Sequence, residues 1–381
     1  MASNPLFELH GQGQSIWFDT ISRSLVASGG LQRLIDDYAV VGVTSNPTIF
    51  EKAISGSAEY DDDIRMLAAA GHCAPAIFER LATDDIRNAC DILLPRYEQS
   101  GHVDGRVSIE VSPNLAHQTE ATMVEARALW RTVDRPNLMV KIPGTREGIP
   151  AIEQMIAEGL SINVTLLFAV SMYEQVMEAY LTGLERRVAQ GQPIDQIHSV
   201  ASFFVSRVDT MVDKELDAKL HAANDSSEQE QLHGLLGKAA IANAKVAYQA
   251  FKRVFSGPRW DALKAKGANL QRPLWASTST KNPAYPDTMY IAELVGPHTV
   301  NTVPENALLA FADHGVVRGS TVEEDSVGAE HVLQRLDEVG IDIRDITERR
   351  LVAEGVTSFA DSFEKLIAEL RKKRDAVSID R

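Results

Sequence analysis

Short apolar runs alternate along the whole chain with stretches in which apolar residues recur at helical spacing. The runs are rich in β-branched residues, and most end in proline, glycine or a polar residue, as expected of short buried strands. They occupy residues 15–20, 40–47, 106–113, 138–145, 160–168, 200–205, 273–278 and 299–304. Strands that alternate with helices predict parallel βα units.

The intervening stretches predict the helices of these units. Helical spacing is clearest in residues 31–38, 118–133, 148–157, 171–189 and 306–313. Several more helices are expected within residues 48–100 and 208–256, the latter interrupted by the polar stretch Asn224-Asp225-Ser226-Ser227, and in the charged tail 327–377.

Eight βα units most simply close into a (β/α)8 TIM barrel with additional helices. An open, doubly wound sheet is the alternative. Such a sheet usually carries a glycine-rich phosphate loop after its first strand, and this chain has none there.

The chain has 381 residues, more than the roughly 250 of a plain eightfold barrel. Its apolar fraction of 44% is sufficient for a large core. No internal repeat, low-complexity segment or linker marks a boundary. We therefore expect residues 1–381 to form a single domain with helical insertions and a helical C-terminal extension.

The charge balance argues against a nucleic-acid-binding or membrane-surface protein. Lysine and arginine total 38, aspartate and glutamate 53, so the net charge is −15. No apolar run approaches the ~18 residues of a membrane span, and residues 1–10 do not resemble a signal peptide. The two cysteines, Cys73 and Cys90, form neither a disulfide framework nor a metal-binding pattern. We expect a cytoplasmic protein without a metal or cofactor; the sequence leaves a monomer and a homodimer equally open.

A lysine stands inside the apolar run Leu138-Met139-Val140-Lys141-Ile142. Burial of an ammonium group without a partner is strongly unfavourable. Lys141 could therefore extend its amine to solvent from near the strand end, or pair with an acid. The alternative is that burial lowers its pKa, so that a neutral amine can attack a carbonyl and form a Schiff base.

Alternation of side chains along a strand places polar groups opposite the apolar face of several strands. On the first strand, for example, Asp19 lies opposite Ile16 and Phe18. The groups expected to share an inner face are Asp19, Glu110, Lys141, Asn163, Thr165 and Ser202. Because the carboxyl ends of barrel strands meet at one mouth, these groups predict one site, although separate strand-end caps and buried ion pairs would give the same pattern.

This combination of groups suits Schiff-base chemistry on a ketose. Attack by the Lys141 amine gives a carbinolamine and then an imine, which requires proton delivery and the loss of water. Cleavage of the carbon–carbon bond requires a base for a substrate hydroxyl. Asp19 and Glu110 can each perform one of these tasks, and alternation alone does not assign them. No metal-ligand spacing is present.

Several motifs resemble those of the transaldolase family, in particular its longer bacterial members, over residues 12–315. They are Trp17-Phe18-Asp19, Thr44-Ser45-Asn46-Pro47, Glu110-Val111, Val140-Lys141-Ile142-Pro143-Gly144-Thr145, the Asn-Val-Thr-Leu-Leu-Phe motif at 163–168, residues 202–209 and Trp275-Ala276-Ser277-Thr278. The resemblance implies a (β/α)8 barrel that transfers a dihydroxyacetone unit. The donor would be sedoheptulose 7-phosphate or fructose 6-phosphate, and the acceptor glyceraldehyde 3-phosphate or erythrose 4-phosphate.

The resemblance also implies catalytic roles. Lys141 matches the Schiff-base lysine, and Asp19 matches the acid/base that accepts the proton of the C4 hydroxyl. Glu110, with Thr165, matches the pair that positions a catalytic water for the carbinolamine and imine steps.

By the same resemblance, Asn46 and Asn163 match residues that bind the dihydroxyacetone hydroxyls, and Ser202 lies beside them. Arg207 matches an arginine that binds the substrate phosphate. Without the resemblance, a surface ion pair would be the simpler interpretation of Arg207, but its position just past a strand end supports an anion-binding role.

The chain departs from the family pattern in two places. Where shorter transaldolases have Ser-Phe-Arg, this chain has Ser277-Thr278-Ser279-Thr280-Lys281. Ser277 carries over, the arginine does not, and we expect Lys281 to supply the second cation for the phosphate. The helical extension after Val327 has no implied catalytic role, and packing on the barrel or a subunit contact is expected for it.

Two other functions fit parts of the pattern. A fructose 6-phosphate aldolase would release free dihydroxyacetone, although glutamate at position 110 favours the transferase. A non-catalytic sugar-phosphate-binding barrel is the third hypothesis, and the lysine with its two acids argues against it.

Overall fold

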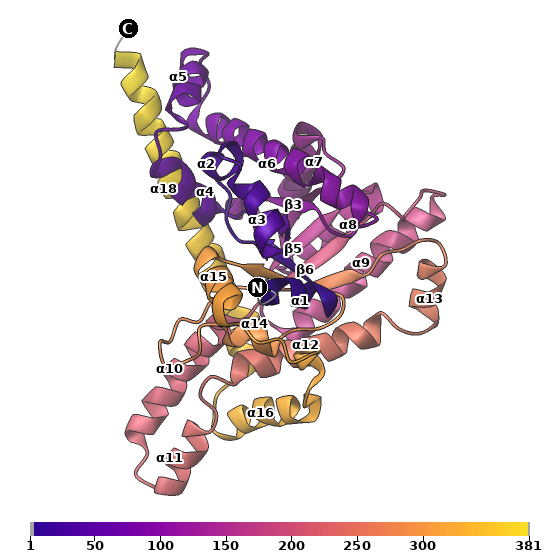
Figure 1. Cartoon of the computed structure of the whole chain (residues 1–381), viewed down its shortest axis with the longest axis vertical. Helices are drawn as coiled ribbons and strands as arrows, with labels where there is room; N and C mark the ends of the chain where they lie inside the picture. Colours follow the sequence, from indigo (N-terminus) through magenta and orange to yellow (C-terminus); the bar gives the residue numbers. More distant parts are fainter. Residues whose placement is uncertain (1–3, 380–381) are drawn as a thin grey trace.

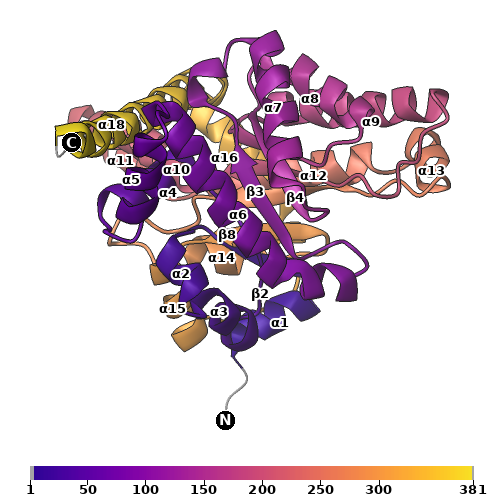
Figure 2. The same cartoon turned by 90° about the horizontal axis from the view of Figure 1, so that it is seen from above.

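A computed structural model describes residues 4–379 and shows a closed barrel of eight parallel strands enclosed by helices (Figure 1 and Figure 2). The strands are β1 (Gln14–Phe18), β2 (Val40–Val43), β3 (Arg106–Glu110), β4 (Leu138–Pro143), β5 (Ile162–Leu167), β6 (Ser199–Phe204), β7 (Gln271–Ala276) and β8 (Thr299–Val303). They follow one another around the barrel, and β1 pairs with β8. Each predicted run overlaps one strand, so the barrel prediction is confirmed and the open-sheet alternative is wrong.

The expected helices are present. They are α3 (Gly30–Tyr38), α4 (Pro47–Ser55), α5 (Asp61–Ala69), α6 (Ala74–Gln99), α7 (Thr119–Val133), α8 (Gly148–Glu158), α9 (Val170–Ala189), α10 (Ser206–Ala222), α11 (Ser226–His233), α12 (Ala239–Val254), α15 (Glu305–His314), α16 (Ser326–Glu338), α17 (Ile343–Asp345) and α18 (Leu351–Ile379), with a π-helical turn η3 (Ile346–Arg350) before α18. Four short helices were not expected: α1 (Pro5–Gly11), α2 (Arg23–Ala27), α13 (Pro258–Lys264) and α14 (Met289–Glu293). Two single-turn 3-10 helices, η1 (Pro113–Leu115) and η2 (Thr321–Glu323), complete the elements.

Side-chain caps explain where two helices begin. Asn46 accepts a hydrogen bond from Ile49 N at 2.9 Å, and Pro47 follows it as the first residue of α4. Asp225 caps α11 by accepting from Glu228 N. The polar interruption predicted at residues 224–227 is therefore shorter than expected, because its two serines already belong to α11.

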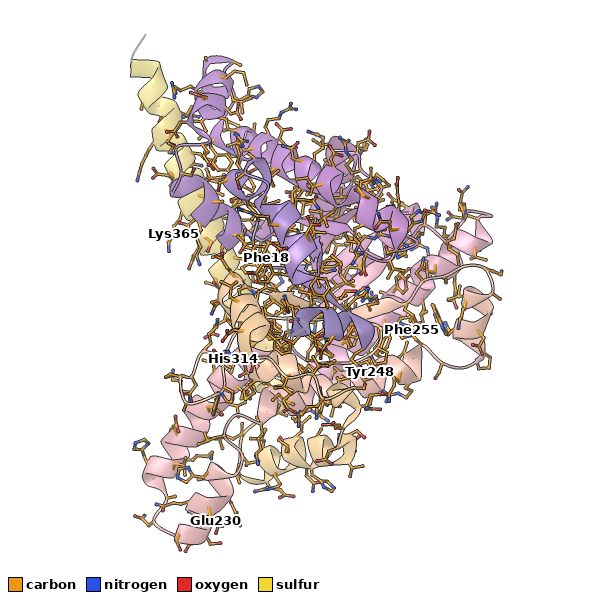
Figure 3. All side chains as sticks on the ribbon, viewed as in Figure 1. Phe18, Glu230, Tyr248, Phe255, His314 and Lys365 are labelled. Atoms are coloured by element: carbon orange, nitrogen blue, oxygen red, sulfur yellow. The ribbon has the colours of Figure 1, made fainter. Side chains whose placement is uncertain are left out.

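The two faces of the strands separate core from site. Residues on the predicted apolar face, such as Ile16, Val140 and Val164, are buried beneath the outer helices. The inner face is closely packed at Trp17, because a Cβ on the neighbouring Gly42 would lie 2.5 Å from Trp17 Nε1. Phe18 lies among densely packed side chains near the middle of the molecule, whereas Glu230 on α11 lies at one end (Figure 3).

The long C-terminal helix α18 packs along α4, α5 and α6 (Figure 1). Its apolar stripe recurs every three to four residues, and four of its members are buried. These four, Phe359, Leu366, Ile367 and Leu370, are joined by Leu351 at the start of the helix, which is also buried. The expectation that the extension packs on the barrel is confirmed. Among the residues that the structure describes, no helix has the length and apolarity required to cross a membrane.

Candidate active site

Lys141 lies on β4 between Glu110 on β3 and Asn163 on β5, its partners in the strand register. The Lys141 side chain is only 5% exposed, so the prediction that its amine extends to solvent is wrong. Lys141 Nζ lies 3.2 Å from Glu110 Oε2 and donates a hydrogen bond of 3.2 Å to Ser45 O. The predicted acid partner is thus Glu110. The prediction that Lys141 forms a Schiff base stays open to experiment.

Glu110 is buried on the other side of this ion pair. Burial raises the pKa of Glu110, and the charge of Lys141 opposes that rise. Although Lys141 is within ion-pair distance, neither Glu110 oxygen has a well-aligned hydrogen bond among the described residues. The same is true of the buried Thr165 Oγ1. Both predicted water-positioning groups therefore retain hydrogen-bonding capacity inside the barrel.

Asp19 follows the last residue of β1, at the mouth of the barrel. Its backbone N–H donates to Val303 O at 3.1 Å, which fixes it against β8. Burial raises the pKa of Asp19 to about 6, and the charges of Lys141, Lys281, Lys52 and Arg207 limit that rise. A carboxyl group with such a pKa can accept and return a proton near neutral pH.

A chain of hydrogen bonds crosses the barrel beneath the mouth. Asn163 Nδ2 donates to Ser108 Oγ at 3.0 Å, and Ser202 Oγ donates to Asn163 Oδ1 at 2.8 Å. Asn163 is fully buried, whereas Ser202 reaches the cavity above it. The Asn163 amide therefore fixes Ser202 in place, and direct contact of Asn163 with a substrate stays a prediction.

A cavity opens at the carboxyl ends of the strands and collects most of the predicted residues. Seven of the ten predicted site residues line this cavity, namely Asp19, Asn46, Lys141, Ser202, Arg207, Ser277 and Lys281. Phe204, Ser279 and Phe359 are also part of its lining. The remaining three, Glu110, Asn163 and Thr165, are not part of this lining. Glu110 and Asn163 are the register partners of Lys141, and Thr165 pairs with Pro143 further along β4.

The mouth of the cavity is cationic. Arg207, in the first turn of α10, lies 5.5 Å from the Phe204 ring centre and 6.0 Å from that of Phe359. Lys281 donates to Ser279 Oγ at 2.7 Å. Neither cation has a carboxylate within ion-pair distance among the described residues, so the surface-ion-pair interpretation of Arg207 is wrong. Uncompensated cations of this kind suit an anionic group.

Sequence reasoning missed Lys52, a third cation at the mouth. Lys52 lies in the last turn of α4 and lines the outer mouth together with Asp19, Arg207 and Lys281. Its charge lowers the pKa of both Asp19 and Lys281. Helical spacing could have identified it, because residues 49, 52 and 56 continue the helix face that begins at Asn46.

Two residues beside the site have backbone angles that are unusual for a side chain with a Cβ. Leu166, next to Thr165, and Ser277 both have φ of +58°. The pairing of β5 with β6 shifts register at Leu166, and its side chain faces Gly355 of α18. Such conformations cost on the order of 1–3 kcal/mol and are frequent at functional sites.

The extension after residue 327 also contributes to the site, which sequence reasoning did not foresee. Phe359 of α18 lines the cavity, and Ser358 lines the outer mouth. The charge of Glu354, one turn earlier, raises the pKa of Arg207, although burial lowers it overall. The extension is therefore one wall of the cavity as well as a packing element.

Residues 4–379 contain no group of three or more His, Cys, Asp or Glu side chains arranged to hold a metal ion. The lysine, the carboxylates and the hydroxyls are the chemically competent groups of this cavity.

A family model described as transaldolase/fructose-6-phosphate aldolase matches residues 16–370. The chain belongs to this family. The match spans the barrel from within β1 onward and most of α18, including every predicted site residue.

Curated relatives cover nearly the full length of the chain. A protein named transaldolase from Parafrankia is 51% identical over 371 residues, which is 97% of this chain and 98% of the relative. One from Mycobacterium marinum is 50% identical over 381 residues, covering 99% and 100%, and one from Mycobacterium tuberculosis is 50% identical over 379 residues, covering 99% of each.

Proposed function

We propose that the protein is a transaldolase of the non-oxidative pentose phosphate pathway. It transfers a dihydroxyacetone unit from sedoheptulose 7-phosphate to glyceraldehyde 3-phosphate, giving erythrose 4-phosphate and fructose 6-phosphate. The observation that carries this proposal is the buried Lys141, ion-paired with Glu110 at the base of a cavity shared with Asp19. Relatives named transaldolase over nearly full length support the same function.

The ion pair supplies a route to the neutral amine. Transfer of one proton from the Lys141 ammonium to Glu110 gives an amine and a carboxylic acid. Burial raises the pKa of Glu110 and so makes this transfer less unfavourable. The amine then adds to the ketose carbonyl, and protonation of the carbinolamine oxygen releases it as water.

Asp19 is suited to the cleavage step. It accepts the proton of the C4 hydroxyl while the C3–C4 bond breaks, and the electron pair of that bond moves into the imine. The aldose phosphate leaves, and the three-carbon unit stays on Lys141 as an enamine. Addition of the acceptor aldehyde reverses these steps, and Asp19 returns its proton to the new hydroxyl.

The remaining residues bind the substrate. Ser202 and Asn46 line the part of the cavity where the dihydroxyacetone hydroxyls would lie, with Asn163 supporting Ser202. We assign the phosphate to Arg207 and Lys281 with Ser277, and we add Lys52 at the outer mouth. Phosphate bound there would compensate cations that have no ion pair in the described structure.

Borohydride trapping tests the proposal directly. Incubation with fructose 6-phosphate and borohydride should add one reduced three-carbon unit to the peptide that contains Lys141. The variant K141A should give no adduct. The variant K245A is the matched control, because Lys245 is also a buried lysine but lies on α12 and donates to Glu324 O. A folded protein that gives no adduct would overturn the lysine mechanism.

A fructose 6-phosphate aldolase is the second candidate, since the family description includes that activity. The two are distinguished by measuring free dihydroxyacetone with and without an aldose acceptor. A transaldolase should release little ketone without an acceptor and form new ketose phosphate when one is added. Equal release under both conditions would favour the aldolase.

We further propose that the protein acts in the cytoplasm without a cofactor, as a monomer or a homodimer. Light scattering coupled to size exclusion would separate the two assemblies, with 41.8 kDa expected for the monomer.

A further inference from the structure

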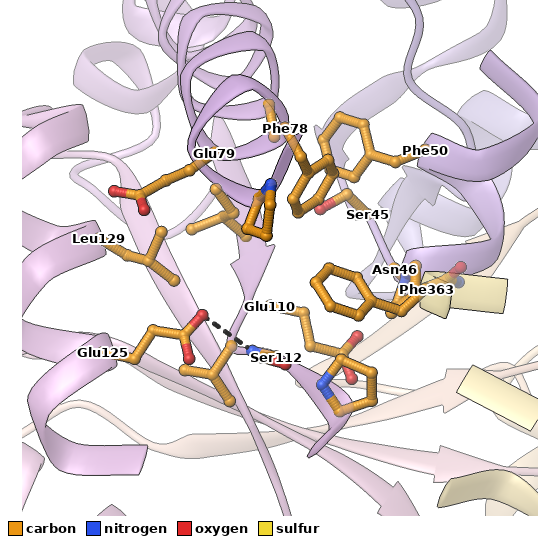
Figure 4. A pocket seen from close by; sticks show the side chains of 16 residues that line it. Ser45, Asn46, Phe50, Phe78, Glu79, Glu110, Ser112, Glu125, Leu129 and Phe363 are labelled. Atoms are coloured by element: carbon orange, nitrogen blue, oxygen red, sulfur yellow. Dashed lines mark hydrogen bonds between the residues drawn. The ribbon is translucent and has the colours of Figure 1, made fainter. Parts of the chain in front are cut away.

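A second cavity lies behind β3, on the outside of the barrel (Figure 4). Its walls come from β3, from α6 and α7, and from the start of α4 together with α18. Its volume is about 250 Å³, enough for a small organic molecule. Apart from Asn46, it shares no lining residue with the cavity above Lys141.

One side of this cavity is aromatic. Phe78 of α6 lies edge-on to Phe50 of α4, with ring centres 5.7 Å apart, and edge-on to Phe363 of α18 at 5.5 Å. Leu129 of α7 completes the apolar lining. These three rings expose apolar and π surface to the same space (Figure 4).

The other side carries two carboxylates, Glu79 of α6 and Glu125 of α7 (Figure 4). Glu125 is partly buried and accepts one hydrogen bond, 3.0 Å long, from Ser112 N. Burial raises the pKa of Glu125, and the charge of Glu79 raises it further. Neither carboxylate forms an ion pair with any cation in the described part of the chain.

We propose that this cavity, which we call the aromatic–acidic cavity, binds a small organic cation that has an apolar body, such as an arylalkylammonium ion. The ammonium group would compensate the two carboxylates, and the apolar body would occupy the space between the rings. Anionic sugar phosphates are the wrong charge for this site, so it is distinct from the transfer reaction. The proposal is independent of the function assigned above.

The inner wall of the aromatic–acidic cavity includes Glu110 and Asn46, which also belong to the proposed active site. A bound cation would therefore lie close to Glu110 and favour its ionised form. The bound cation should therefore slow imine formation, in which Glu110 accepts a proton from Lys141. Only this consequence rests on the proposed function.

Binding of phenethylammonium, measured by isothermal titration calorimetry, tests the proposal. The double variant E79Q/E125Q removes both charges but keeps the Glu125 side-chain shape and its acceptor for Ser112 N. We expect its affinity for phenethylammonium to fall at least tenfold, whereas the affinity for neutral 2-phenylethanol stays within twofold. The matched control is E120Q, the same substitution at an exposed position of α7.

Two results would overturn the proposal: no measurable binding of phenethylammonium to the unsubstituted protein, or unchanged affinity of the double variant for phenethylammonium. If the double variant does not fold, E79Q alone keeps the test valid, because Glu79 is exposed. A failed Lys141 trapping experiment would leave this binding result unaffected.

Discussion

At the scale of single residues, the site is a set of charged side chains that are buried from solvent. Lys141 and Glu110 compensate each other at 3.2 Å, whereas Asp19 has no single partner and is surrounded by more distant cations. Burial of a charge reduces folding stability unless its partners restore the lost hydration. Asp19 is therefore the residue at which function and stability conflict most clearly.

Asp19→Asn should stabilise the protein at neutral pH. The folded-state pKa of about 6 lies above the usual 3.8, so between these values the folded protein retains a proton that the unfolded chain releases. Stability contributed by Asp19 is thus lost as pH rises from about 4 to 6. We expect the variant to gain roughly 2–3 kcal/mol above pH 6 and little at pH 4, measured by urea unfolding. An equal gain at both values would exclude this explanation.

The cleavage step should depend on the same ionisation. Asp19 must be ionised to accept the C4 hydroxyl proton, so the single-turnover rate should fall about tenfold per pH unit below about pH 6. Asp19→Ala should cleave slowly at every pH while its imine with dihydroxyacetone remains trappable by borohydride. Loss of trapping in a folded variant would instead assign Asp19 to imine formation.

Lys52→Met should weaken the binding of phosphorylated substrates. An exposed charge contributes up to about 1 kcal/mol, so KM for fructose 6-phosphate should rise roughly three- to fivefold with kcat little changed. Imine formation with unphosphorylated dihydroxyacetone should be unaffected. Lys264→Met is the matched control, because Lys264 also lies in the last turn of its helix, α13. Equal effects of the two variants would remove Lys52 from the site.

Period-two alternation near strand ends predicted six of the site residues, namely Asp19, Glu110, Lys141, Asn163, Thr165 and Ser202. The other four, Asn46, Arg207, Ser277 and Lys281, came from the family resemblance. Alternation indicates on which face of a strand a side chain lies, but not how deeply it is buried. For this reason the sequence did not distinguish Asn163 from Ser202. Phe359 lies on a helix that reaches the mouth from elsewhere in the chain, and no local pattern indicates where that helix packs.

At the scale of elements, all eight strands were predictable because each is an apolar run bounded by turn residues. The missed helices α1, α2, α13 and α14 have at most seven residues, too few for a clear helical period. The role of α18 was not predictable. Its amphipathic stripe indicates that one face is buried but does not identify the elements against which that face packs.

Phe359→Leu should test whether α18 is part of the site. Leucine keeps most of the buried apolar surface but removes the ring beside Arg207. We expect KM for fructose 6-phosphate to rise about two- to fivefold with kcat preserved. Phe363→Leu, one turn later, is the control, because that ring faces Phe78 in the aromatic–acidic cavity and should leave KM unchanged.

At the scale of the whole molecule, a chain of net charge −15 concentrates three cations at one mouth. Its overall field repels anionic substrates, and the local cations must overcome it at short range. The expectation that residues 1–381 form a single domain also belongs to this scale and stays a prediction.

Thermal unfolding should show one cooperative transition. The closed barrel joins its first and last strands, so opening at any point exposes the common core. Far-ultraviolet circular dichroism and tryptophan fluorescence should report the same midpoint, because Trp17 and Trp275 are fully buried in strands. Two separated transitions would show that one part of the chain unfolds independently of the rest and would contradict the single-domain prediction.

The closure of β1 on β8 joins two segments of the chain that are synthesised at very different times. Asp19 is among the first residues to leave the ribosome, but its backbone is fixed by Val303, nearly three hundred residues later. Phe359 is translated later still. A nascent chain that already contains Lys141 and Glu110 therefore has the proposed nucleophile long before the proposed acid/base is in position. We expect activity to begin only when translation is almost complete.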